Sequence, residues 1–421
     1  MGRVPDPPGI RVAPRSDQEA WLREYVARIC QMDNRRFPGS QPVSFAKSDL
    51  VKLESQDFWV CEKSDGLRVL LFVNTDPTSR SQTVYLIDRN NNYYELQGLF
   101  FPNATQLPLL DTIVDGELVY DVDPRTKQET LRFLAFDCLV VDGQNIMARP
   151  LDKRYARLKS FFFQPFDKMK KDHSHVTKTH PFDIRVKKVE FSYSAQQVFA
   201  DMANLQHGSD GLIYTCVNAP YTPATDDNIL KWKPPSENSI DFKLVLRFPP
   251  LPENPLQPDF HAKPIFLLHV WCGDTRYEQY DQMYVDDEEW ERFKASGEQY
   301  DDRIVEVRWD AAESHWKWMR FRPDKPNGNH RSIVEKILGS IADGVEKDTL
   351  LERSSAIRTA WKARVAHPPP SGNLHAPGSG PPPSTISQHA AVPPLELRYG
   401  RLATSQWSRV AGPLIVAGMN R

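Results

Sequence analysis

Short apolar runs separated by polar turns fill the chain from about residue 37 to 242, and this pattern is typical of β-strands. Ahead of them, residues 17–32 place apolar side chains three and four positions apart, which predicts an amphipathic helix. Helical spacing returns at 149–163 and 194–206. The pattern therefore predicts a mixed α+β domain over residues 1–242, with an N-terminal helix. Its strands are expected at 67–73, 84–87, 112–114, 133–140 and 211–215.

A second strand-rich block follows the first domain. Its apolar runs lie at 242–246, 264–271 and 304–309. A block of roughly 80 residues made of short strands suits a small barrel, and we expect an OB fold for residues 243–328. A charged helical pattern then covers 331–353. It predicts a C-terminal helix, within 329–360, that packs back on the first domain.

The end of the chain changes composition to Pro, Gly, Ser and His. Nine prolines lie between Pro368 and Pro394. Such a segment cannot bury enough apolar surface to offset the entropy lost on ordering. We therefore expect residues 361–421 to form a disordered tail.

Composition narrows the protein class more than the function. A chain of 421 residues that is 40% hydrophobic can form two domains of ordinary size plus tails. The formal net charge is −2, so any nucleic-acid-binding surface must be local. The five cysteines are scattered without a Cys-x-x-Cys pair, which favours free thiols in a reducing compartment over disulfides or a zinc ribbon. The chain shows neither a signal peptide nor an apolar run long enough to span a bilayer, so an intracellular protein without a membrane partner is expected.

One lysine stands at the junction of an apolar run and a turn. Residues 62–68 contain Lys63-x-Asp65-Gly66-x-Arg68, directly after the apolar run 58–61. Desolvation and neighbouring cations would both disfavour the charged form of Lys63 and free its amine to act as a nucleophile. The alternative, a surface lysine in a β-turn, is the commoner meaning of this motif taken alone.

Two acidic turns carry candidate ligands. Asp115-Gly116-Glu117 ends an apolar strand, and Glu117 could bind a ribose hydroxyl or a metal. Asp210 opens a buried strand at a similar turn, which suits a divalent-metal ligand. Hairpin turns of the Asp-Gly type are the alternative in both places.

Paired cations suggest a phosphate ligand. Alternation along a strand places Lys231 and Lys233 on one face, where they repel unless an anion lies between them. A pair of solvated lysines is the alternative. Further cations follow a strand at Arg89 and cluster at 320–325, where Arg322 and Lys325 flank Asp324. The cluster could hold a polyphosphate or could be a solvated strand end.

Taken in order, these motifs resemble those of the covalent nucleotidyltransferase superfamily, which contains the mRNA capping guanylyltransferases and the polynucleotide ligases. The chain is most similar to the stand-alone fungal capping enzymes. Residues 37–44 resemble the segment that precedes the nucleophile there, Ile87-Asp88-Arg89 matches a downstream arginine, and the Arg-x-Asp-Lys cluster matches a final motif that many ligases lack. The resemblance covers roughly residues 35–350.

The resemblance implies an α+β fold: an ATP-grasp-like ligase (nucleotidyltransferase) domain and a C-terminal OB-fold β-barrel that closes over an interdomain cleft. It also implies that Lys63 attacks GTP to form a lysyl-N-GMP, which passes to the 5′-diphosphate end of RNA. Asp115 would support the ribose-binding turn, and Phe136 would stack on the guanine. Asp210 would place Mg²⁺ or Mn²⁺. The other implied GTP ligands are Arg68, Arg89 and Glu117 at the ribose, Lys231 and Lys233 at the α-phosphate, and Arg322, Asp324 and Lys325 at the β,γ-phosphates.

The resemblance implies partners as well. No segment before residue 35 is long enough for an RNA triphosphatase domain, so a separate RNA 5′-triphosphatase subunit is expected. The phosphorylated C-terminal tail of RNA polymerase II and a nuclear location are implied too. An ATP-using ligase and a silent RNA- or polymerase-binding scaffold remain alternatives, and labelling with GTP or ATP distinguishes them.

Overall fold

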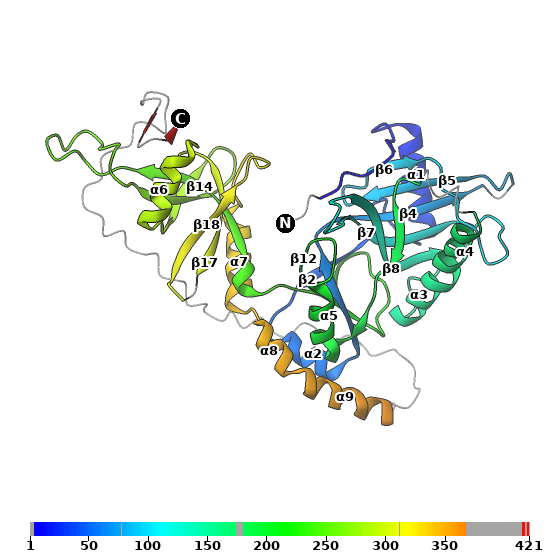
Figure 1. The fold of residues 1–421 in the computed structure, drawn as a ribbon. Helices are drawn as coiled ribbons and strands as arrows, with labels where there is room; N and C mark the ends of the chain where they lie inside the picture. Colours follow the sequence, from blue (N-terminus) through cyan, green and yellow to red (C-terminus); the bar gives the residue numbers. More distant parts are fainter. Residues whose placement is uncertain are drawn as a thin grey trace. The chain divides into compact units, whose positions relative to one another are not determined.

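The computed structural model describes residues 4–76, 78–173, 180–310 and 312–367, together with the strands β19 (Ile415–Val416) and β20 (Met419–Asn420). The chain divides into two compact units. Unit 1 contains Met1–Lys233 and Lys347–Pro368, and unit 2 contains Pro234–Glu346. Figure 1 shows both as ribbons, and each is described here by itself.

An eight-stranded sheet forms the centre of unit 1. Its inner strands pair antiparallel, whereas the edge strand β10 pairs parallel with β8. The strands follow one another as β1 (Ile10–Arg11), β6 (Tyr93–Leu96), β5 (Gln82–Asp88), β4 (Leu67–Thr75), β7 (Thr112–Val122), β8 (Glu129–Val141) and β10 (Asp183–Val186), with β9 (Gln144–Asn145) on β8.

Both faces of this sheet are covered, which explains the uninterrupted apolar run in β4. Leu70 and Phe72 point to one face, in a cluster with Leu22 and Val26 of helix α1 (Asp17–Ile29). Val69, Leu71 and Val73 point to the other face, because successive side chains of a strand alternate. There they meet apolar side chains of α3 (Leu151–Arg157), the π-helical turn Leu158–Phe163 and α4 (Gln164–Asp172), which Figure 1 shows along that face.

A second sheet of unit 1 carries the predicted nucleophile. Its five strands are β11 (Glu190–Phe191), β3 (Phe58–Ser64), β12 (Ser209–Cys216), β13 (Ala224–Trp232) and β2 (Ser40–Ser44), in that order. The helices of this part of unit 1 are α2 (Asp49–Ser55), the 3₁₀ turn Ser192–Ser194, α5 (Ala195–Met202), α8 (Lys347–Glu352) and α9 (Ser354–Ala366).

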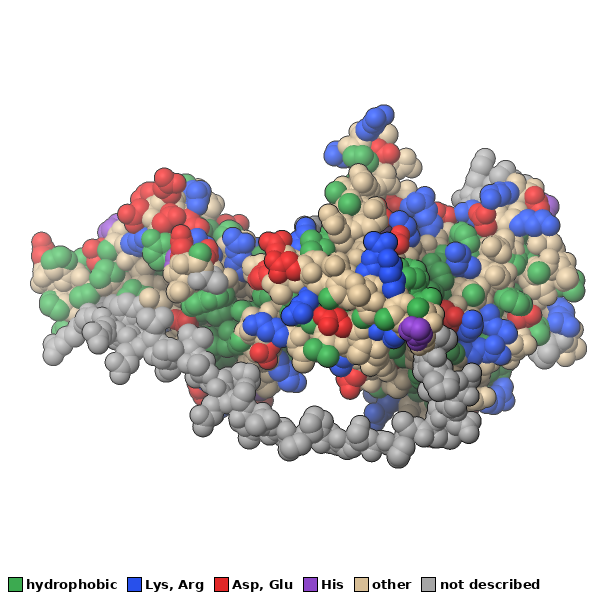
Figure 2. All heavy atoms as spheres, turned by 90° about the horizontal axis from the view of Figure 1, so that it is seen from below, with side chains coloured by type: hydrophobic (Ala, Val, Ile, Leu, Met, Phe, Trp, Pro, Cys, Tyr) green, Lys and Arg blue, Asp and Glu red, His purple; other side chains and the backbone are tan. Residues whose placement is uncertain are grey.

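Arg364 holds helix α9 against the rest of unit 1. Its side chain bonds Asp57 at 2.7 Å and also donates to the backbone carbonyl groups of Glu54 and Gln56. Figure 2 views the side of the molecule on which α9 lies in Figure 1 and shows basic and acidic side chains interspersed there. This mixture agrees with a formal net charge of only −2.

Unit 2 is built on a closed five-stranded barrel. Phe242, Leu244, Val270 and Trp316 lie in its core, and Val334 of α7 (Arg331–Ala342) packs against them. Helix α6 (Asp287–Ser296) begins with a capping box and ends at Gly297, whose φ of 65° favours glycine. A 3₁₀ turn, Pro235–Glu237, precedes the barrel. The strands close in the order β14 (Ser239–Arg247), β15 (Ile265–Trp271), β16 (Tyr277–Met283), β18 (His315–Phe321) and β17 (Ile304–Asp310).

The domain limits expected from the sequence need correction. A boundary between residues 242 and 243 falls inside β14, and unit 2 begins at Pro234. The single helix expected in 329–360 is three helices: α7 belongs to the barrel unit, and only α8 and α9 belong to unit 1. Helix α9 also continues into the expected tail, as far as Ala366. Most of 361–421 lies outside the described residues. Among the described residues, no helix has both the length and the apolar character needed to cross a bilayer.

Candidate functional site

Lys63 lies at the end of β3, where β12 and β13 bring other charged side chains beside it. Its Nζ donates a hydrogen bond to Oδ1 of Asp210 at 2.6 Å, and Lys233 forms an ion pair with the other oxygen of the same carboxylate. The register explains this contact, because β12 pairs Ser209 with Ser64, each a direct chain neighbour of one partner. The sequence placed Lys63 among cations, and the structure adds a carboxylate in direct contact.

Lys231 belongs to the same group of cations. Its pKa is lowered, first by partial burial and then by the positive charges of Lys63, Arg89 and Lys233. In the described part of the chain neither Lys231 nor Arg89 forms an ion pair. Cations that repel one another without a carboxylate between them favour an anionic ligand. The structure thus places Lys231 close enough to Lys63, Arg89 and Lys233 for their charges to act on it.

A buried polar network lies beside this cluster. Arg68 of β4 is bound by Asp115 of β7 in a two-bond fork, with Nε–Oδ1 at 3.0 Å and Nη2–Oδ2 at 2.6 Å. The Tyr221 hydroxyl donates to the same Asp115 carboxylate at 2.5 Å, and Arg68 also donates to the Ser40 backbone carbonyl. Burial lowers the pKa of Arg68, but the attraction of Asp115, Tyr221 and Glu117 outweighs it, so this pKa is raised. The guanidinium is therefore fixed and charged.

Glu117 follows Asp115 on β7 and faces the turn after Lys63. One of its oxygens accepts the backbone N–H of Gly66 at 3.2 Å. A Cβ at position 66 would lie 2.2 Å from the carbonyl oxygen of Leu118, so only glycine permits this approach of the two strands. Burial raises the pKa of Glu117, although Lys187 and Lys63 oppose that shift.

These side chains line a cavity of about 300 Å³. Phe136 of β8 lies in its wall, with its ring centroid 5.6 Å from the guanidinium carbon of Arg68. The other lining side chains are a mixture of apolar ones, such as Val60, Leu151 and Ile213, and polar ones, such as Lys187 and Tyr221. The candidate residues in the lining are Lys63, Arg68, Arg89, Asp115, Glu117, Phe136 and Lys231.

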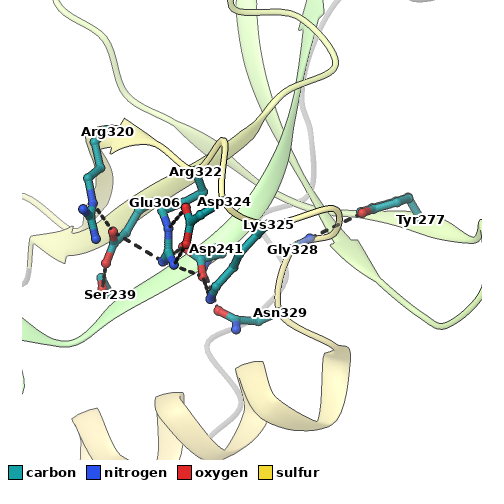
Figure 3. Close-up of polar contacts among 10 residues, drawn as sticks. All are labelled: Ser239, Asp241, Tyr277, Glu306, Arg320, Arg322, Asp324, Lys325, Gly328 and Asn329. Carbon is teal, nitrogen blue, oxygen red and sulfur yellow. Dashed lines mark hydrogen bonds and ion pairs between the residues drawn. The ribbon is translucent and has the colours of Figure 1, made fainter. Parts of the chain in front are cut away.

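The remaining candidates belong to unit 2. Arg322 holds Asp324 through two bonds, at 2.9 and 2.7 Å, and reaches Asp241 of β14 at 3.0 Å. Lys325 forms an ion pair with the same Asp241. Figure 3 shows these side chains converging at the start of β14. Arg322, Asp324 and Lys325 are thus neighbours in unit 2.

Comparison with known proteins decides the family. The family model of the mRNA capping enzyme catalytic domain matches residues 8–235, and that of the mRNA capping enzyme C-terminal domain matches residues 237–351. The chain belongs to the mRNA capping enzyme family. The resemblance drawn from the motifs is confirmed, and the activity is that of an mRNA guanylyltransferase, a nucleotidyltransferase.

Curated relatives agree over most of the chain. The "mRNA-capping enzyme subunit alpha" of Yarrowia lipolytica is 40% identical over 373 residues, which are 87% of this chain and 94% of that protein. The protein of the same name from Schizosaccharomyces pombe is 41% identical over 85% of this chain and 89% of its own length. A solved mycobacterial DNA ligase D complexed with ATP and MES aligns at 15% identity over 68% of this chain and 95% of that chain, and its TM-score of 0.34 is too low to carry an argument.

The structure also adds site residues that the motifs did not indicate. Lys187 is buried, lines the cavity, donates to the Ser64 hydroxyl at 2.8 Å and pairs with Glu62 at 3.3 Å. Tyr221 and Ser40 complete the network around Arg68. In the sequence, Lys187 is followed by a second lysine, a pair that normally indicates a solvated surface, and Tyr221 lies in a loop. Only the position of Ser40 within the segment 37–44 could have suggested a role.

The carboxylates suit a metal only in part. Among the described residues, no group of three or more His, Cys, Asp or Glu side chains could hold a metal ion. Asp115 is bound by Arg68 and Tyr221 and is fully buried, whereas Asp210 is bound by Lys63 and Lys233 and is 18% exposed, so Asp210 is the more accessible of the two. Mg²⁺ commonly binds through one or two carboxylates together with substrate phosphates, so a single aspartate fits a metal that arrives with the nucleotide.

Proposed function

We propose that Lys63 is the nucleophile of the guanylyltransferase reaction. Once deprotonated, its amine forms a bond to the α-phosphorus of GTP and releases a further proton to solvent, while the bond from that phosphorus to the bridging oxygen breaks and pyrophosphate leaves. The 5′-diphosphate end of an RNA then takes the GMP from lysine, which restores the amine and forms the 5′–5′ triphosphate cap. The observation that carries this proposal is the position of Lys63 in the cavity, with Lys231 and Arg89 on the same lining.

The other side chains of the cavity would bind the nucleotide. We propose that Lys231 and Lys233 hold the α-phosphate, because cations around the equatorial oxygens stabilise the charge of the transition state. Phe136 would stack on the guanine. Arg89 and Glu117 would hold the ribose. Arg68 would contact the ribose with them, but it would mainly form a rigid part of the cavity wall, because Asp115, Tyr221 and Ser40 already accept hydrogen bonds from most of its N–H groups.

Asp210 is the proposed ligand of Mg²⁺ or Mn²⁺. Such an ion would supply charge neutralisation on the phosphates when it is bound. In the structure Asp210 bonds both Lys63 and Lys233, so the same carboxylate that would bind the ion also contacts the proposed nucleophile.

We further propose that the barrel of unit 2 is an OB fold that closes over the nucleotide. Its strands close in the order first, second, third, fifth and fourth, and α6 lies between the third and fourth along the chain. Closure would carry Arg322, Asp324 and Lys325 to the β,γ-phosphates and orient pyrophosphate as the leaving group. Opening would then expose the bound GMP to RNA.

The printed name "subunit alpha" of the fungal relatives suggests a partner subunit. We propose that a separate RNA 5′-triphosphatase subunit supplies the diphosphate ends, that the protein acts in the nucleus, and that it binds the phosphorylated tail of RNA polymerase II.

Incubation with α-labelled GTP or ATP and Mg²⁺, followed by denaturing electrophoresis, tests the nucleophile. We expect label from GTP, stable to denaturation, and at least a thousandfold less in Lys63→Ala, because the covalent acceptor is gone. Lys153→Ala, whose side chain is 65% exposed on α3, is the matched control and should label normally. Undiminished labelling of Lys63→Ala would refute the assignment of the nucleophile, and labelling from ATP alone would refute the choice of GTP.

A further inference from the structure

A buried aspartate of the barrel joins the two cations of the 322–325 segment. Asp241 on β14 is only 4% exposed. Its carboxylate accepts both bonds from Nη1 of Arg322, at 3.0 and 3.1 Å, and also pairs with Lys325. Sequence motifs gave no indication of this residue, which lies about 80 positions from its partners.

The backbone of Asp241 fixes the same segment a second time. Its N–H donates to Oδ1 of Asn329 at 2.7 Å, and the N–H of Asn329 donates to its carbonyl at 2.7 Å. Gly328 makes this approach possible, because a Cβ there would lie 2.7 Å from the carbonyl oxygen of Asp241. Figure 3 shows Asp241 between Arg322, Lys325 and Asn329. The segment is therefore tied to one residue through both side chain and main chain.

The charges around Asp241 divide into a buried and an exposed set. The buried acids are Asp241 and Glu306, whose side chains are 5% and 6% exposed. Lys325 and Arg320, which pair with them, are 34% and 48% exposed. Arg322 is 15% exposed, and Asp324, which it holds, is an acid that is 61% exposed. A polyphosphate arriving from solvent would thus meet Lys325 most directly and would share Arg322 with Asp324. Asp241 and Glu306, on the buried side, hold the direction of the cations without covering them.

We propose that Asp241 is a positioning residue that aims Arg322 and Lys325 at the leaving pyrophosphate. This proposal rests on the proposed function of that segment and extends it to a residue that does not touch the nucleotide. Lysine and arginine side chains lose much rotamer freedom when they bind an anion. Because the carboxylate of Asp241 holds both in place beforehand, that loss is incurred in folding and not at the reaction step.

The opposite role for Asp241 would be competition. A carboxylate that occupies the cations could withhold them from pyrophosphate, and its removal would then strengthen pyrophosphate binding and speed the reaction. Positioning and competition therefore predict opposite changes in one measurement.

The test separates the two half-reactions in the full-length protein. Asp241→Asn keeps the shape of the side chain and removes its charge. We expect formation of the lysyl-GMP from labelled GTP to slow about a hundredfold, as for a 1 Å misplacement of catalytic groups. Transfer of GMP from preformed enzyme–GMP to diphosphate RNA should stay within about twofold of the wild type, because no pyrophosphate takes part in it.

Gly328→Ala provides a second perturbation of the same segment that leaves every charge in place. It should reproduce the loss in the first half-reaction. Asp301→Asn is the matched control: Asp301 is buried in the same barrel, accepts a bond from the Leu246 backbone and contacts neither cation. It should leave both half-reactions at wild-type rates. Thermal unfolding of each variant shows whether the barrel still folds.

Each outcome decides between the alternatives. Unchanged or faster lysyl-GMP formation in Asp241→Asn overturns the positioning role, and so does an equal loss in both half-reactions. If Asp241→Asn does not fold, Gly328→Ala decides alone. Wild-type protein that takes no label from GTP, or Lys63→Ala that still does, overturns the proposed function instead, so the two failures are distinguishable.

Discussion

The buried pair of Arg68 and Asp115 should be the most sensitive point of unit 1 to a single change of charge. Asp115 is fully buried and Arg68 is 8% exposed. Asp115→Asn keeps the volume of the side chain but removes the charge that opposes the guanidinium. The remaining partners of Arg68, the Ser40 carbonyl and the Tyr221 hydroxyl, are neutral. Glu117 attracts Arg68 but forms no ion pair with it among the described residues, so the variant leaves the interior cation without a carboxylate in direct contact.

The size of this effect follows from the burial of the pair. Removal of one partner of a buried ion pair lowers the free energy of unfolding by about 3–5 kcal/mol. For a unit of this size, each kcal/mol shifts the melting temperature by about 2–4 °C, so a decrease of about 6–20 °C is expected. Tyr221→Phe removes the hydrogen bond to the charged carboxylate together with the acceptor of the Arg68 and Ser40 N–H groups, and it should lower the free energy of unfolding by about 1.5–3 kcal/mol.

Urea unfolding followed by tryptophan fluorescence, together with calorimetry, measures both variants. Asp172→Asn, an exposed aspartate at the end of α4, is the control and should change the free energy of unfolding by less than about 0.5 kcal/mol. A loss below about 1 kcal/mol in Asp115→Asn would refute the reasoning, because it would mean that solvent or another group already compensates Arg68.

Two further predictions concern the surroundings of Asp210 and a buried histidine. Gly211 has a φ of 156°, and a Cβ there would lie 2.0 Å from the Trp232 carbonyl oxygen. Gly211→Ala should therefore separate β12 from β13 and lower the melting temperature measured by calorimetry by more than about 10 °C. An unchanged melting temperature would contradict this prediction. Burial lowers the pKa of His207, but Asp121 and Glu62 outweigh burial and raise it. Its charged form therefore stabilises the fold below the unfolded pKa of about 6.5, and this contribution is lost as pH rises through the raised folded pKa. The free energy of unfolding should therefore fall less between pH 6 and 8.5 in His207→Gln than in the wild type. An equal fall in both proteins would refute the assignment.

The local pattern of apolar and polar residues was sufficient to identify the candidate site residues that lie near the ends of strands. Lys63, Asp210 and Lys231 each follow or begin an apolar run, and the alternation of a strand fixes the face on which such a side chain lies. Their meeting in space then follows from the pairing of β3, β12 and β13. Sequence order alone could not give that pairing, and the family resemblance implied only that these residues act at one site.

Other members of the site carry no local pattern. Lys187 follows a short parallel edge strand, and its burial depends on Glu62 and Ser64, which lie more than 120 positions earlier. Asp241 likewise gives no local signal of its burial, since an aspartate within an apolar strand could equally face solvent. Buried charged residues of this kind are recognised only from their partners. Motifs therefore indicate the groups that are proposed to contact the ligand more readily than the groups that hold them in place.

The domain boundaries were misplaced for a related physical reason. Hydrophobic periodicity shows that a helix has an apolar face but not which surface covers that face. Residues 331–342 and 354–366 have similar helical patterns, yet Val334 packs in the barrel core whereas Ile357 is buried in a helix of unit 1. Within residues 4–367, the chain thus leaves unit 1 after Lys233 and returns to it at Lys347, so two covalent connections join the barrel unit to unit 1 there. The proposed closure would have to be absorbed at both connections, and Arg364 holds the chain that follows the second connection to the rest of unit 1.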